Sequence, residues 1–148
     1  MIQILLFVHV LSAASWLSAA IWVAGDVRRT LALGKPFVTA LPARLLSAVR
    51  ADQWAGTATL LTGFALIGYQ EMAMKTHPRM SIVLGLALAV VRLGLYGALL
   101  SPAAKKLVAR IQAGEDVPAA DPAAKRIAMV NGIGHLLWVL ILACMFWY

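Results

Sequence analysis

Long apolar runs alternate with short polar segments along this chain, and each run has about the length of a membrane-crossing helix. About 20 residues, at a rise of about 1.5 Å each, cross the roughly 30 Å hydrocarbon core of a bilayer. The pattern therefore predicts an all-α integral membrane protein, with one domain over residues 1–148 built as a bundle of four transmembrane helices. The expected spans cover about residues 2–24, 54–69, 80–100 and 127–148.

The polar segments between these runs are expected to lie outside the membrane as amphipathic linkers. Residues 25–53 should form a linker that includes a short amphipathic helix lying on the lipid headgroups. The Ser-Pro pair at 101–102 has the pattern of a helix cap with proline in the first turn, and it would begin a separate basic segment at 103–113. Asp121-Pro122 repeats this signal and should start the fourth span.

Basic residues predict the orientation of the bundle. The linkers after the first and third expected spans hold five Lys or Arg residues each, whereas the turn at 70–79 holds two. By the positive-inside rule, both linkers face the cytoplasm and both termini lie on the periplasmic side of a bacterial inner membrane. This distribution also explains the net charge of +7 without a nucleic-acid partner, for which there is no motif. The expected partners are the lipid bilayer and a second copy or a larger membrane complex.

Soft metal donors gather in the turn between the second and third expected spans. They lie within nine residues of one another: Met72, Met74, His77 and Met80. Thioethers with an imidazole suit Cu(I), and uncharged ligands tolerate an exposed, oxidising location. The turn is thus a candidate copper site, with His9 as a deeper ligand. The alternative is that methionine simply fills the membrane interface, as it often does.

Three ionisable side chains lie deeper in the expected spans, namely His9, Arg92 and His135. Such groups are costly inside a membrane and often mark functional sites. They are the candidate residues for haem b, although helical counting separates the two histidines by about 8 Å along the bundle. No Asp or Glu lies within an expected span, so Arg92 should bind a carbonyl, an amide such as Asn131, or a ligand carboxylate such as a haem propionate. The alternative for each is a structural role in the bundle.

Enzyme chemistry has little support in the sequence. There is no carboxylate pair within the spans, no Ser-His-Asp set, no phosphate-binding loop and no GxGxxG element. Hydrolase, kinase and nicotinamide-dependent activities are therefore not expected. A third functional class remains open beside copper and haem binding, in which the protein is an accessory subunit whose Gly- and Ala-rich helix faces dock on a membrane complex.

The stretch 8–16, VHVLSAASW, resembles the first helix of the CopD-like membrane proteins, and the segments 61–63, 84–86 and 101–107 are similar to theirs too. That group includes the copper-resistance D domain, related four-helix proteins and, distantly, the HemJ-type protoporphyrinogen oxidases. The resemblance implies a four-helix bundle, His9 as the first-helix histidine, and a link to copper or haem. HemJ-type proteins pair this histidine with a third-helix lysine. Here the third span offers only Arg79 at its mouth and Arg92 within it.

Overall fold

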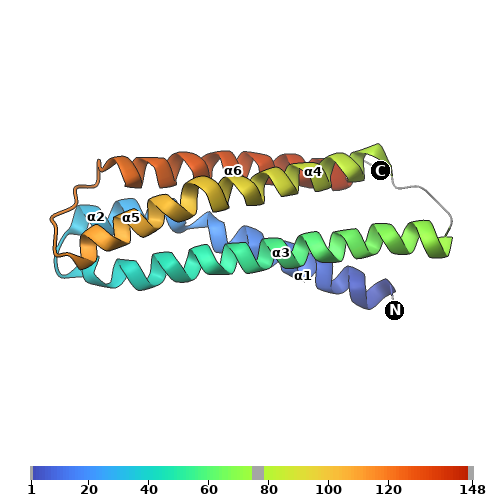
Figure 1. The fold of residues 1–148 in the computed structure, drawn as a ribbon, viewed down its shortest axis with the longest axis horizontal. Coiled ribbons are helices and arrows are strands. Elements are labelled where there is room, and N and C mark those ends of the chain that lie inside the picture. Colours follow the sequence, from blue (N-terminus) through green and yellow to red (C-terminus); the bar gives the residue numbers. More distant parts are fainter. Residues whose placement is uncertain (1, 75–78, 147–148) are drawn as a thin grey trace.

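The computed structural model describes residues 2–74 and 79–146, which fold almost entirely as helices (Figure 1). This part of the chain contains no strand, and the all-α prediction is confirmed. The elements in order are α1 (Ile2–Ile21), α2 (Val23–Leu33), the 3-10 turn η1 (Phe37–Ala40), α3 (Leu41–Met74), α4 (Met80–Leu95), the π-turn η2 (Tyr96–Leu100), α5 (Ser101–Gln112) and α6 (Pro122–Phe146).

Three helical stretches of the described residues are long and apolar enough to cross a membrane. They are Ile2–Leu33, Met80–Gln112 and Pro122–Phe146. Most of their side chains face outward, and many large apolar ones are exposed, as expected for a surface that contacts lipid rather than water. The fold is therefore a helical bundle with the character of a membrane protein. α3 is as long as these stretches but more polar.

The helices pack as two neighbouring pairs, α1 along α3 and α4 along α6 (Figure 1). At one end, α2, α5 and the first turns of α3 and α6 close around the main hydrophobic core. The core side chains with almost no exposure are Leu41, Leu45, Leu100, Leu107, Ile127 and Val130. The two pairs are therefore held together most tightly at the end that carries the amphipathic helices.

The second span begins earlier than predicted, because α3 runs unbroken from Leu41 to Met74. The expected short helix on the headgroups does not form as a separate element. Instead, Leu41, Leu45 and Val49 are buried in the core, at the spacing of one helix face. Burial of this stripe against the bundle outweighs the polar character of the segment, and it carries Asp52 into the bundle as well.

The expected helix cap at 101–102 is also wrong. Ser101 has helical dihedral angles, and its amide bonds the carbonyl of Tyr96 through the π-turn, so the helix continues from α4 into α5. Buried Leu100 and Leu107 lie on either side of this junction. The apolar face of the helix thus passes through it without interruption, and tertiary packing overrides the local stop signal.

The helix start predicted at Asp121-Pro122 is confirmed, and the linker before it begins at a glycine. Gly114 ends α5 with a φ of +79°, a conformation that favours glycine. Asp121 caps α6 by accepting the amide of Ala123 at 2.8 Å, and its other oxygen accepts from Arg110. Burial alone would raise the pKa of Asp121, but the Ala123 amide and the Arg110 guanidinium hold it below its usual value.

Candidate functional site

A fully buried arginine joins all the long helices at one level of the bundle. Nη2 of Arg92, on α4, donates to Oδ1 of Asp52 on α3 at 3.1 Å, and Nε donates to the Gly134 carbonyl on α6 at 3.1 Å. Its guanidinium carbon lies 4.2 Å from the ring centroid of Trp16 on α1 and 4.5 Å from that of Tyr96. These distances fit cation–π contacts on both rings. We call Arg92, Asp52, Trp16 and Tyr96 the arginine layer.

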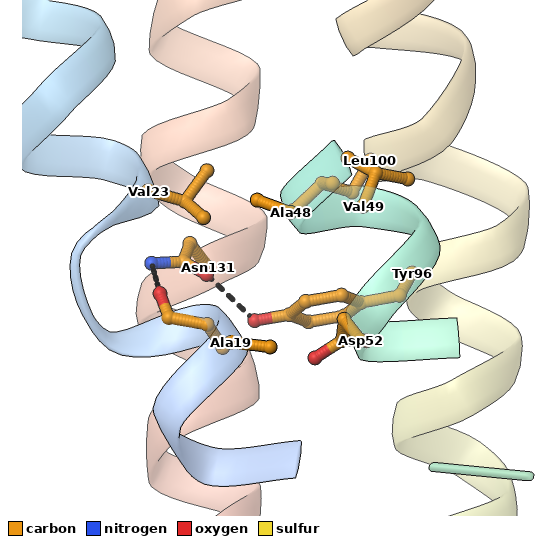
Figure 2. A pocket seen from close by; sticks show the side chains of 9 residues that line it. Ala19, Val23, Ala48, Val49, Asp52, Tyr96, Leu100 and Asn131 are labelled. Carbon is orange, nitrogen blue, oxygen red and sulfur yellow. Dashed lines mark hydrogen bonds between the residues drawn. The ribbon is translucent and has the colours of Figure 1, made fainter. Parts of the chain in front are cut away.

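A second set of hydrogen bonds extends this layer toward the break between α1 and α2. The Tyr96 hydroxyl donates to Oδ1 of Asn131 at 2.8 Å, and Nδ2 of Asn131 donates to the Ala20 carbonyl at 3.0 Å (Figure 2). α1 ends at Ile21, and carbonyls in the last turn of a helix lack an intrahelical partner. Asn131 thus uses both ends of its amide to fix α6 against α1 and η2.

A small cavity lies beside these hydrogen bonds, between Asp52, Tyr96 and Asn131 and the apolar side chains around them (Figure 2). It leaves about 10 Å³ for the centre of a water molecule, which is about the lower limit for holding one. The space is therefore too small for a haem or another organic cofactor.

Several buried polar atoms near the layer lack a hydrogen-bond partner among the described residues. They are Nε1 of Trp16, Oδ2 of Asp52, Nη1 of Arg92 and Nε2 of His135. Unsatisfied buried groups cost about 1–3 kcal/mol each unless water reaches them. These unpaired polar atoms add nothing to the packing of the bundle, and each of them costs stability.

Two glycines let the aromatic rings approach the layer. A Cβ atom at Gly134 would lie 2.4 Å from the hydroxyl oxygen of Tyr96, and one at Gly56 would lie 2.7 Å from the indole of Trp16. No side chain larger than hydrogen fits at either position unless the ring moves. These close approaches set the position of both rings against Arg92.

His9 forms a separate site nearer the other end of the bundle, between α1 and α3. Its Nδ1 lies 2.9 Å from Oγ1 of Thr62, and that hydroxyl bonds the Ala58 carbonyl at 2.7 Å. A hydroxyl has one proton, and if it goes to that carbonyl, Thr62 accepts from His9 and Nδ1 carries the imidazole proton. Nε2 then holds the lone pair. The ring lies against Gly63, where a Cβ would be 3.3 Å from its Cε1.

The two histidines lie at different depths. His9 is level with Thr62 on α3, whereas His135 follows Gly134, whose carbonyl bonds Arg92 level with Asp52. Thr62 and Asp52 are about 15 Å apart along α3, at about 1.5 Å per residue. His9 therefore belongs to one level and His135, with Arg92, to another.

Soft side chains from α6 pack against α4 beside Leu86, whose side chain approaches the glycine next to His9. The side chain of Leu86 contacts the position of Gly63, against which the His9 ring lies, and at the neighbouring Gly85 the side chains of Met145 and Cys144 come within 3.0 and 3.2 Å of an added Cβ. The side chains that carry a thioether and the only thiol of the chain thus pack at Gly85 on α4, next to Leu86.

The predicted methionine-rich turn is only partly visible. Met72 and Met74 belong to the last turn of α3, but their side chains, and all of His77, lie outside the described residues. Met80 begins α4 and is 80% exposed. Among the described residues, no three His, Cys, Asp or Glu side chains come together as a metal site.

Sequence reasoning missed Asp52 as the partner of Arg92, because it placed this residue in a polar linker. The signal that identifies it is the helical spacing of the buried residues before and after it on α3: Leu41, Leu45, Ala48, Asp52, Gly56 and Thr59. Asp52 lies on this stripe. The sequence analysis expected a carbonyl among the possible acceptors for Arg92, and the bond to Gly134 confirms this. It did not expect the second acceptor, the carboxylate of Asp52.

No family model matches the chain, and comparison with curated proteins and solved structures gives no match either. The resemblance to CopD-like proteins stays a prediction from the sequence.

Proposed function

We propose that the protein is a four-span membrane protein of the bacterial inner membrane that binds copper at its periplasmic end, with His9 as the deeper ligand. The observation that carries this proposal is the hydrogen bond between Nδ1 of His9 and Thr62. It leaves Nε2 with its lone pair, as a metal ligand requires, and a partner on the other nitrogen is what orients most metal-binding imidazoles. A neutral imidazole with thioethers suits Cu(I).

In this proposal copper would bind at two successive sites, which we call stations. Met72, Met74, His77 and Met80 would capture the ion at the mouth of the bundle. Thr62, level with His9, lies about 18 Å from the Met74 end of α3, so one ion does not touch both stations in this conformation. Met145 and Cys144, whose side chains pack at Gly85 next to Leu86, are the soft donors that we assign to the second station.

The ion pair of Arg92 supports α3 as the fourth span. Asp52 lies about a third of the way along this helix, which runs from Leu41 to Met74, and a lone carboxylate there would oppose insertion into a bilayer. Its Oδ1 bonds Arg92, and the side chain is 3% exposed. Pairing inside the bundle reduces the cost of both charges, so α3 can cross beside the three more apolar stretches.

Titration with Cu(I) against a competing chelator tests the proposal. Replacing Met72, Met74 and Met80 together by Leu should lower the affinity at least tenfold, because no charged ligand compensates for the lost sulfurs. Met129→Leu is the matched control, since Met129 is also exposed, at 58%, but lies near the start of α6. An affinity that the triple substitution leaves unchanged rejects the capture site, and one that His9→Gln leaves unchanged rejects the deeper ligand.

A haem b protein is the second candidate, because the same Nε2 lone pair can ligate haem iron. His9 would then be the single histidine ligand, since His135 lies about 15 Å away along the bundle. Arg92 already has Asp52 as its anionic partner. A Soret band that disappears on His9→Ala would favour haem over copper. A colourless, metal-free protein that co-purifies with one partner would instead favour the accessory-subunit hypothesis.

A further inference from the structure

Three helices carry the same unusual pattern, a pair of adjacent basic residues on an otherwise core-facing helix. All six side chains are exposed, and buried residues immediately precede and follow each pair. We call these six residues the basic collar: Arg28-Arg29 on α2, Lys105-Lys106 on α5 and Lys125-Arg126 on α6. Each helix therefore buries its apolar face in the core and turns a dibasic pair outward.

The acidic side chains at this end of the bundle do not neutralise the collar. Asp26 pairs with Arg44, and both Glu115 and Asp121 pair with Arg110. None of these three ion pairs involves a collar residue, and the described structure shows no ion pair for the collar itself. Its positive charge is left for a partner outside the chain.

The collar surrounds the end of the bundle at a limited range of depth. Counted from the arginine layer, its three pairs lie between about 12 and 20 Å along their helices. α2, α5 and the start of α6 lie together at that end (Figure 1). Large apolar side chains are exposed on the same helical stretches beside it, including Trp22 at 44% and Met129 at 58%.

This combination identifies the partner. Exposed apolar side chains next to the collar suit acyl chains, whereas adjacent cationic side chains suit the phosphates above them. We propose that the basic collar binds anionic phospholipids, with phosphate groups held between basic side chains around the bundle. The inference rests on the membrane placement in the proposed function and does not depend on copper or haem.

Lipid selectivity tests this proposal. The protein is reconstituted in phosphatidylcholine bilayers, and its association with spin-labelled phosphatidylglycerol is compared with that of spin-labelled phosphatidylcholine. The wild type should prefer phosphatidylglycerol severalfold, and the preference should fall as salt is raised. Replacing any one collar pair by Gln, as in Lys105→Gln/Lys106→Gln, should reduce the preference for phosphatidylglycerol. The reduction should be at most about fivefold for each side chain replaced.

Lys75→Gln/Arg79→Gln is the matched control, because it removes the same charge from the turn between α3 and α4 and should leave the preference intact. Helicity measured by circular dichroism in the same bilayers identifies any variant that fails to fold, and variants of the other two collar pairs then provide the test.

Equal association of the two lipids with the wild type overturns the proposal, as does an equal loss of preference in collar and control variants. Binding of an acidic peptide or nucleic acid without lipid preference also overturns it. Copper affinity is unaffected by any of these outcomes, so failure here is distinguishable from failure of the proposed function.

Discussion

The ion pair between Asp52 and Arg92 should be the most strongly coupled charged contact in the described structure. Asp52→Asn leaves a fully buried guanidinium facing a neutral amide, and Arg92→Met leaves a carboxylate with 3% exposure and no cation beside it. Removing one partner of a buried pair costs about 3–5 kcal/mol. The double variant removes both charges, so it should cost less than the sum of the single variants. We expect a coupling energy of about 2–3 kcal/mol, the upper part of the range for contacting residues.

The assay is a double-mutant cycle of unfolding free energies in mixed detergent micelles, followed by tryptophan fluorescence. The chain offers a matched control, the pair Asp26–Arg44, with the same 3.1 Å separation between nitrogen and oxygen but side chains 25% and 42% exposed. Solvent should limit its coupling energy to about 1 kcal/mol or less. Equal coupling energies for the two pairs would refute the reasoning, because burial would then have no effect on the interaction.

Three further predictions concern packing, pH and metal binding. Gly134→Ala should destabilise the bundle by about 1–3 kcal/mol, because its Cβ would overlap an aromatic ring, whereas Gly132→Ala, with no atom within 4 Å, should not destabilise it; thermal unfolding compares the two. The pKa of Asp121 lies below its usual 3.8, so its carboxylate stabilises the fold above about pH 4 and this contribution disappears as the pH falls through the lowered pKa. Unfolding free energies measured from pH 6 to 3 should therefore fall less for Asp121→Asn than for the wild type. Thr62→Val removes the acceptor that orients His9 and should weaken copper or haem binding about 10- to 100-fold in a ligand titration.

Local signals in the sequence predicted local structure well. The helical content, the start of α4 at Met80 and the cap at Asp121 all follow from apolar runs and from residues adjacent in the chain. The cap at 101–102 failed although its local signal was similar. What separates the two cases is that the apolar face of α4 continues into α5 through Leu100 and Leu107, and the sequence pattern alone did not reveal that the junction lies inside the bundle.

Contacts between helices were harder to predict. The rotation of each helix about its axis decides whether Arg92 meets Asp52, and helical counting gives only depth. The same holds for His9, which the sequence placed deep in the first expected span but could not pair with Thr62 on α3. Asp52 was missed for a simpler reason. Its polar neighbours on α3 suggested a linker, although the apolar stripe of the helix passes through it.

The orientation of the bundle is the claim on which the proposed function depends. It can be measured with a Cys144→Ser background, which removes the only thiol, and with single cysteines introduced as Glu71→Cys or Asp116→Cys, two exposed positions at opposite ends of the bundle. A membrane-impermeant maleimide applied to intact spheroplasts should label the cysteine at position 71 and leave the one at 116 unlabelled until the membrane is opened. Labelling at 116 with protection at 71 would contradict the account, because the methionine-rich turn would then face the cytoplasm and the basic collar the periplasm.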